Sequence, residues 1–377
     1  MSPAARAARG GNQSGGNQSG GNRRDAKPAA TEDFTPPPIR SWDDLIGHQR
    51  TRQSLQNAIA RNRISGSYLW VGPQGIGKST TAVLLAQTLM CRTREPAEMD
   101  PCGVCPDCIQ VHAGTHPDLA RVRKPDGRAS IPIDLLIGPP EARMQEGFCR
   151  DLRMRPLQGR CRVGILQDAD SLQIEAANCL LKTLEEPPAG AVIIVIGSSE
   201  QRQLPTIRSR CRVVRMGPLA EADAANVLRT RMGVDASSET MIQAIRDCGG
   251  DLRAAARCLG STGQALRQTW QQTLSAPVID PLAVIRELNS QMNAAGKEPA
   301  KRRDALRDAL AMIISLQREQ VRSAAAAGVH DDAGLRRIDR SVRAVREIDR
   351  MANLSTVIEC YAADLLLSRT GDRGQIG

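Results

Sequence analysis

Aromatic side chains are scarce in this chain: Phe, Trp and Tyr together make up 2% of the 377 residues. Proteins that bind single-stranded nucleic acid commonly stack the bases on aromatic rings, so such stacking is not expected to be the main activity. Long apolar runs are also missing. No stretch approaches the roughly eighteen apolar residues that a membrane helix needs, and the N-terminus lacks the apolar core of a secretory signal. We therefore expect a cytoplasmic protein with no membrane partner.

The charged residues are unbalanced in sign. Lys and Arg total 51 against 41 Asp and Glu, which gives a formal net charge of +10. This excess favours an anionic partner such as the DNA backbone, although an arginine-rich surface that is merely solvated would give the same count. The chain also contains 11 cysteines. In a reducing compartment, a metal site explains clustered cysteines, and burial explains scattered ones, better than disulfides do.

Composition divides the chain into four parts. Residues 1–40 contain the repeat GGNQSGGNQSGGN and the triplet PPP. Such a segment cannot bury enough apolar area to offset its chain entropy, so it is expected to be disordered. Residues 41–217 carry both strand and helix signals, whereas residues 218–270 and 271–377 carry only helical periodicity. The plan is therefore an α/β domain, a small helical domain and a larger all-helical domain.

Within the α/β part, short apolar strands alternate with amphipathic helices. Strands are predicted at Tyr68–Val71, Arg160–Asp168 and Ala191–Ser199, and the segment IEAANCLLKTLEE between the last two is a predicted helix. This alternation predicts a parallel sheet covered on both faces. At the entrance to the domain, four apolar residues have a spacing that would place them on one helical face: Leu45, Ile46, Leu55 and Ile59.

A phosphate-binding loop follows the first predicted strand. The segment GPQGIGKS fits the pattern G-x-x-x-x-G-K-[ST] in full, between a strand and a helix that starts at Lys78. In this pattern the glycines let backbone N–H groups turn around a triphosphate, the lysine neutralises phosphate charge, and the hydroxyl of Ser79 reaches Mg²⁺. The predicted ATP-binding residues are Gly72, Pro73, Gln74, Gly75, Ile76, Gly77, Lys78, Ser79 and Thr80.

The strand ending at Asp168 decides whether bound nucleotide would be hydrolysed. Asp168 is the expected partner of Mg²⁺ together with Ser79. In ATPases of this layout a carboxylate directly after that aspartate orients the attacking water, but Ala169 stands there. Asp170 is one residue further on, and on an extended backbone it would point to the opposite side. The sequence therefore supports nucleotide binding better than hydrolysis.

Four cysteines lie in the segment CRTREPAEMDPCGVCPDC at metal-ligand spacing. They are Cys91, Cys102, Cys105 and Cys108. Two overlapping C-x2-C steps can wrap a tetrahedral ion, and four thiolates leave no open position, so the pattern predicts a structural Zn²⁺ site. His112 and His116 lie nearby and are expected to be surface residues or to support the ligands.

Two arginines are candidates for contacting phosphate. Arg210, in the triplet Ser-Arg-Cys, is either a solvated or paired surface charge or a guanidinium that reaches a neighbouring subunit's nucleotide. Arg253 follows Gly-Gly-Asp-Leu at the start of a helix, where it either lies over a bound phosphate in the same chain or belongs to an ordinary capped surface helix.

Taken together, these motifs resemble the bacterial clamp-loader subunits of the AAA+ class, the DNA polymerase III delta prime and gamma/tau subunits. The segments NCLLKTLEEPPAG and LPTIRSRCR carry most of the similarity, which covers roughly residues 42–260. The resemblance implies an α/β AAA+ domain with a zinc-binding insert, a helical lid and an all-helical C-terminal collar.

The resemblance also assigns roles and partners. It implies zinc on the four cysteines, an arginine finger at Arg210, a first sensor at Ser198 or Ser199, and a second sensor at Arg253. It further implies ATP and Mg²⁺ as ligands and a hetero-pentamer with gamma/tau and delta subunits, which acts on the sliding clamp and primed DNA.

Ala169 and the absence of a long C-terminal extension favour the delta prime type over gamma/tau. The alternatives are the gamma/tau-type ATPase motor and a standalone ATPase of DNA repair.

Overall fold

The computed structural model describes residues 39–125, 128, 130–276 and 278–367. The tail that the sequence predicts to be disordered, residues 1–40, lies outside this range except for Ile39 and Arg40. Among the described residues, none of the helices combines the length and the apolar character that crossing a membrane requires.

A five-stranded parallel sheet forms the first part of the fold, with strand order β2-β3-β4-β1-β5. The strands are β1 (Gly66–Val71), β2 (Leu119–Val122), β3 (Arg162–Leu166), β4 (Ala191–Gly197) and β5 (Arg212–Arg215). The predicted parallel sheet is confirmed. Strands β2 and β5 were not predicted because they are four-residue strands at the two edges, with charged residues where buried strands are apolar.

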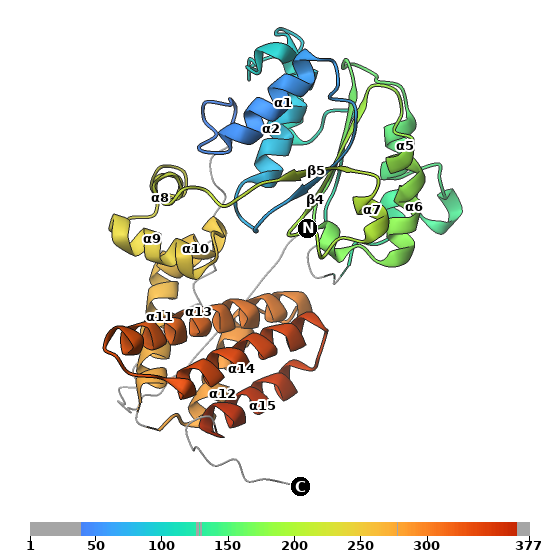
Figure 1. The fold of residues 1–377 in the computed structure, drawn as a ribbon. Helices are drawn as coiled ribbons and strands as arrows, with labels where there is room; N and C mark the ends of the chain where they lie inside the picture. Colours follow the sequence, from blue (N-terminus) through green and yellow to red (C-terminus); the bar gives the residue numbers. More distant parts are fainter. Residues whose placement is uncertain (1–38, 126–127, 129, 277, 368–377) are drawn as a thin grey trace, which may run out of the picture. The chain divides into compact units, whose positions relative to one another are not determined.

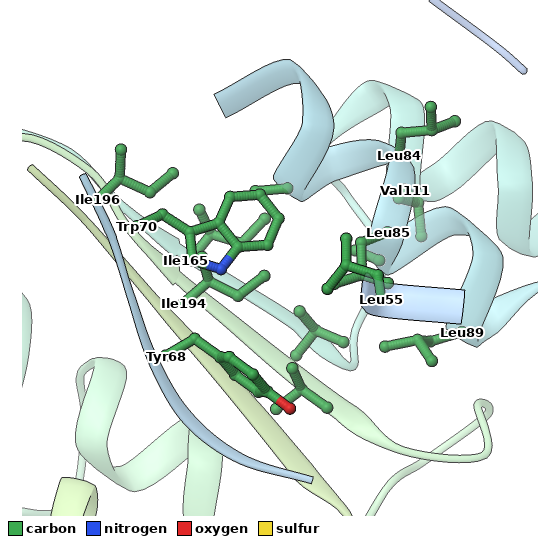
Figure 2. Packing of buried hydrophobic residues seen from close by; sticks show 14 of the residues in the cluster. Leu55, Tyr68, Trp70, Leu84, Leu85, Leu89, Val111, Ile165, Ile194 and Ile196 are labelled. Carbon is green, nitrogen blue, oxygen red and sulfur yellow. The ribbon is translucent and has the colours of Figure 1, made fainter. Parts of the chain in front are cut away.

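Side chains alternate across the sheet and create two apolar cores. Tyr68 and Trp70 of β1 face one core, with alternate residues of β3 and β4, whereas Leu69 and Val71 face the other. Figure 2 shows the first core, where these rings and Ile165, Ile194 and Ile196 meet leucines of α1 and α2 and Val111 of α3. A strand buried on both faces is apolar at most positions, which is why β1, β3 and β4 were visible in the sequence.

Seven α-helices accompany the described sheet, on its two faces (Figure 1). The first core is covered by α1 (Gln49–Ala60), α2 (Lys78–Met90) and α3 (Pro106–Ala113). The second is covered by α4 (Asp134–Ile137), α5 (Phe148–Arg153), α6 (Ile174–Glu185) and α7 (Pro205–Arg208). Three short 3-10 turns lie between them, at Pro96–Glu98, Pro140–Ala142 and Ala169–Ser171.

The predicted helical face at the domain entrance is wrong for two of its four residues. Helix α1 begins only at Gln49, because Gly47 and His48 both have positive φ, 78° and 56°, and turn the chain before it. Leu45 and Ile46 therefore precede the helix, while Leu55 and Ile59 lie on it.

The remaining helices form two further apolar clusters. A compact group consists of α8 (Glu221–Thr230), α9 (Ser238–Asp247) and α10 (Leu252–Leu259). The second consists of α11 (Ser261–Ser275), α12 (Pro281–Ala294), α13 (Pro299–Ala326), α14 (Asp332–Asp349) and α15 (Leu354–Leu367). The predicted architecture, a parallel-sheet domain followed by helical units, is confirmed. The domain boundaries after residues 217 and 270 stay predictions.

Candidate functional site

The phosphate loop joins the end of β1 to the start of α2. Gly75 and Gly77 have φ values of 74° and 96°, which side-chain-bearing residues rarely adopt. A Cβ on Gly72 would lie 2.1 Å from the carbonyl oxygen of Met216. These positions therefore require glycine, and they bring the loop backbone to the N-terminus of α2, where free N–H groups and the helix dipole attract anions. The loop therefore has the conformation of a phosphate-binding loop, and its binding of ATP stays a prediction.

Lys78 lies in the first turn of α2 with its ammonium group turned back over the loop. Its Nζ donates hydrogen bonds to the carbonyl oxygens of Gly72, at 2.7 Å, and Pro73, at 2.5 Å. Burial lowers the pKa of Lys78, while the carboxylates of Asp170, Asp251 and Asp168 act in the opposite direction. A cation held among three acidic groups at the head of a helix is placed to neutralise phosphate charge. The side chains of Ser79 and Thr80, next on the helix, are half-buried.

The sequence led us to expect that the backbone after β3 continues in extended form, but it does not. Asp168 has a left-handed conformation, with φ of 56°, and a 3-10 turn over Ala169–Ser171 follows it. Asp168 is exposed, whereas Ala169 is buried. The prediction that Asp170 points away because the backbone is extended is therefore wrong.

The carboxylate of Asp170 is nevertheless engaged in hydrogen bonds within the protein. Its carboxylate accepts hydrogen bonds from the backbone N–H of Ser198, at 2.9 and 3.2 Å, and from the side-chain amide of Gln203. The acidic group thus ties the turn after β3 to the end of β4. This contact brings Ser198, the predicted sensor, next to Asp170, while the hydroxyl of Ser199 accepts a bond from the N–H of Arg202.

The segment before α1 contacts the phosphate loop and also lines a pocket, and neither feature was predicted from the sequence. His48 donates a hydrogen bond from Nε2 to the carbonyl oxygen of Ile76 at 2.6 Å, which joins the segment before α1 to the phosphate loop. A cavity of about 330 Å³ opens beside this segment. It is lined by Trp42, Asp43, Leu45, Ile46, Gly47, Gln49, Arg52 and Asp223. The only sign of it in the sequence was the run SWDDLIGHQ, whose apolar residues were assigned to a helix.

Asp251 caps α10 and was also not assigned a role. Its Oδ1 accepts bonds from the backbone N–H groups of Arg253 and Ala254 at 2.9 and 3.1 Å. The same oxygen lies 2.0 Å from the position that a Cβ on Gly75 would take, so this acid contacts the phosphate loop. The side chain of Arg253 is exposed. Its role as second sensor stays a prediction.

Arg210 lies just beyond α7. It forms an ion pair with Glu185 at the end of α6, and its Nη1 donates to the carbonyl oxygen of Thr206 at 3.0 Å and to the hydroxyl of Ser209 at 3.1 Å. Three contacts hold the guanidinium in one direction, although 30% of the side chain stays exposed. The predicted arginine finger is thus a positioned surface group.

The four cysteine sulfurs converge. Their Sγ atoms all lie within 4.8 Å of one another, and those of Cys102 and Cys108 are 3.9 Å apart. Zn–S bonds of about 2.3 Å in a tetrahedron place sulfurs roughly 3.8 Å apart, so the cluster has the dimensions of a Cys₄ zinc site. Backbone N–H groups of Cys105 and Cys108 donate to the sulfurs of Cys102 and Cys105. The cluster could therefore hold zinc.

A buried polar network attaches this cysteine module to the edge of the sheet. Asp107, between two of the cysteines, accepts a hydrogen bond from Arg92 at 3.0 Å and lies 3.4 Å from Nε2 of His116. Nδ1 of His116 accepts from the N–H of Asp118, so the neutral imidazole carries its proton on Nε2 and donates it to Asp107. His116 thus supports the module, and His112 is half-exposed.

Asp118 at the start of β2 organises the loop before β3. Its carboxylate accepts three backbone N–H bonds, from Leu157, Gln158 and Gly159, at 2.7 to 2.8 Å. Although burial raises its pKa, these bonds and Arg162 outweigh burial and lower it overall.

Metal content provides a direct test of the cysteine cluster. Protein purified without chelator is expected to contain about one zinc ion per chain, and Cys105→Ser is expected to reduce this to near zero, because a structural site needs all four ligands. Elemental analysis and thiol titration would measure both. Cys360→Ser, at an exposed position on α15, is the matched control and should leave the zinc content unchanged. The assignment would be contradicted if the wild-type protein contained no zinc and the four cysteines of the cluster all titrated as free thiols.

Comparisons with known proteins agree with the motifs. The model of a family described as "DNA polymerase III, delta subunit" matches residues 47–220. The DNA polymerase III subunit delta' of Pseudomonas aeruginosa is 34% identical over 224 residues, which is 59% of this chain and 64% of that protein. The corresponding subunit of Bacillus subtilis is 34% identical over 48% of this chain and 50% of its own length.

More distant relatives carry other names. The DNA polymerase III subunit tau of Salmonella typhimurium is 33% identical over 46% of this chain and 25% of its own length. Among solved structures, a gamma subunit-related protein of Thermotoga maritima matches 84% of this chain with 16% identity and a TM-score of 0.44. The chain thus spans between one quarter and two thirds of these sequence relatives.

Proposed function

We propose that this chain is a clamp-loader subunit of the DNA polymerase III delta prime type, which its residues 47–220 resemble, and that it helps to load a sliding clamp on primed DNA. In this proposal it works in the cytoplasm within a hetero-pentamer that includes delta and gamma/tau subunits. Its contribution is to bind ATP, to hold its neighbours, and to donate Arg210 to the nucleotide site of one of them.

The nucleotide site is proposed to take ATP with Mg²⁺. The phosphate loop and Lys78 would bind the phosphates, the hydroxyl of Ser79 and the carboxylate of Asp168 would bind the metal, and bound Mg²⁺ would neutralise phosphate charge. Ser198 and Arg253 complete the site as the proposed sensors.

The observation that supports poor hydrolysis is the geometry of the turn after β3. Ala169 has no group that can accept a proton, and the carboxylate of Asp170 already accepts bonds from Ser198 and Gln203. A water beside the phosphate would therefore lack a positioned base, which normally contributes a factor of roughly 100 to 10,000 in rate. The site is proposed to bind ATP and to hydrolyse it poorly.

The cysteine cluster is proposed to hold a structural Zn²⁺. Four thiolates fill its coordination, so the ion would fix the segment between α2 and α3 and would not bind substrate. Through Asp107 and His116 the module is joined to the start of β2, so zinc would also stabilise that edge of the sheet.

Brisk turnover by the isolated chain would favour the gamma/tau-type motor, which the intact phosphate loop would also suit, over this proposal. We expect the purified full-length protein to bind ATP with Mg²⁺ but to hydrolyse less than about 1% of it in the time an ATPase motor needs for one turnover, as loss of a base predicts. Single-turnover assays with labelled ATP would measure this. Brisk hydrolysis that depends on Lys78 would contradict the proposal.

Association provides the complementary test. A standalone DNA-repair ATPase would bind DNA tightly as a monomer, with an affinity that falls steeply with salt. The proposed subunit should instead co-purify from native lysate with other clamp-loader subunits, identified by mass spectrometry.

A further inference from the structure

Two cysteines outside the zinc cluster face each other in the small helical group. Cys248 ends α9, Cys258 lies on α10, and their Sγ atoms are 3.9 Å apart, with the thiol of Cys248 donating to the sulfur of Cys258. Both residues are partly exposed, as a reaction with a small reagent requires. None of the roles proposed above uses either residue.

The distance suits a disulfide. A disulfide bond is about 2.05 Å long, so forming it would bring the two sulfurs closer together by roughly 2 Å. Helices α9 and α10 share the apolar cluster formed with α8, and this packing keeps the two thiols opposite each other.

The surroundings make the two thiols unequal. The hydrogen bond from Cys248 lowers the pKa of Cys258 and raises that of Cys248. The guanidinium groups of Arg257 and Arg267 also lower the pKa of Cys258, against the opposing effects of burial and Asp308. Because the thiolate is the nucleophile in thiol exchange, Cys258 is the attacking residue and Cys248 the resolving one.

We propose that Cys248 and Cys258 form a reversible disulfide when the protein meets a small-molecule disulfide. The Cys258 thiol loses its proton to solvent, and the resulting thiolate attacks one sulfur of the reagent, forms a mixed disulfide and releases one small thiolate. Cys248 then loses its proton to solvent and attacks Sγ of Cys258, which forms the internal S–S bond and displaces the second small thiolate. The protein loses two electrons and two protons, and the reagent is reduced to two thiols.

The bond would close a loop around the turn that carries Asp251 and Arg253. This turn contains Gly249 and Gly250, with φ values of 61° and 86°, and its Asp251 contacts the phosphate loop at Gly75. A crosslink across it restricts the opening of the α9–α10 connection. The link to nucleotide binding rests on the proposed function, while the chemistry of the pair does not.

The test is disulfide mapping on the full-length, zinc-loaded protein. The chain is incubated with oxidised glutathione, free thiols are alkylated, and peptides are identified by mass spectrometry. We expect a Cys248–Cys258 crosslink in the wild type. Hydrogen exchange of the amides of residues 249–254 should slow by about tenfold or more in the crosslinked protein, since the closed loop disfavours local opening.

Single variants distinguish the roles of the two thiols. Cys248→Ser should trap Cys258 as a stable glutathione adduct, whereas Cys258→Ser should leave Cys248 largely free. Cys360→Ser, on α15, should leave the crosslink unchanged. Free thiols, or separate glutathione adducts on both residues in the wild type, would overturn the proposal, and unchanged hydrogen exchange would overturn its effect on the turn. Neither readout needs nucleotide or a partner subunit, so failure here is distinct from failure of the proposed function.

Discussion

Replacing Arg210 with alanine is expected to slow ATP hydrolysis at the neighbouring subunit's site by roughly 1,000-fold. A guanidinium supplied across a subunit interface stabilises charge that develops on the transferred phosphate, and a planar fork does this better than a point charge. In the isolated chain the group is paired with Glu185, whose single charge a triphosphate would outcompete. Single-turnover hydrolysis by the reconstituted complex would measure the effect. The rates at the different nucleotide sites must be resolved, so that the slowed site is distinguished from the others.

Two variants sharpen this test. Arg208→Ala removes an exposed arginine from the same short helix and should leave the rate unchanged. Arg210→Lys keeps the charge but loses the fork, so it should behave more like the alanine variant than like the wild type. If the Arg210→Ala complex assembles and still hydrolyses ATP at the wild-type rate, Arg210 does not act on the neighbouring subunit's nucleotide.

Replacing Lys78 with alanine is expected to weaken ATP binding roughly 100-fold, because charge-assisted hydrogen bonds contribute about 1.5–3 kcal/mol each and the ammonium is placed to make more than one. Titration calorimetry in the presence of Mg²⁺ would measure the dissociation constant. The physical basis is the position of Nζ, which turns back over the loop to the carbonyls of Gly72 and Pro73.

The same contacts require a stability control for this variant. Lys78→Ala also removes two hydrogen bonds that shape the empty loop, so its thermal unfolding should be measured without nucleotide. Lys301→Ala, which removes an exposed lysine paired with Glu298 on α13, is the matched control and should bind ATP as the wild type does. Near wild-type affinity in Lys78→Ala would contradict the nucleotide site.

Local patterns predicted the geometry best where neighbours in sequence are also neighbours in space. The phosphate loop and the C-x2-C steps are short segments whose residues act together, and the structure brings the four sulfurs within 4.8 Å of one another. The first cysteine, Cys91, joins this group from the end of α2 because the intervening segment folds back.

Asp170 illustrates where local reasoning failed. Its direction was inferred from an extended backbone, but the left-handed residue before it reverses the chain, and its partners Ser198 and Gln203 come from the end of β4 and beyond. The same holds for His48 and Asp251, which reach the phosphate loop from 28 residues before Ile76 and from the helix after Gly250. No periodicity signals contacts of this kind.

The sequence by itself determined a set of local patterns: a glycine loop of the phosphate-binding type, four cysteines at metal-ligand spacing, and an alanine directly after Asp168. These patterns depend on residue type and on short spacings along the chain, and tertiary packing changes neither. The tertiary structure decided how the acids are used and which cysteines meet, including Cys248 and Cys258 at 3.9 Å, because such contacts depend on how separate helices and strand ends pack.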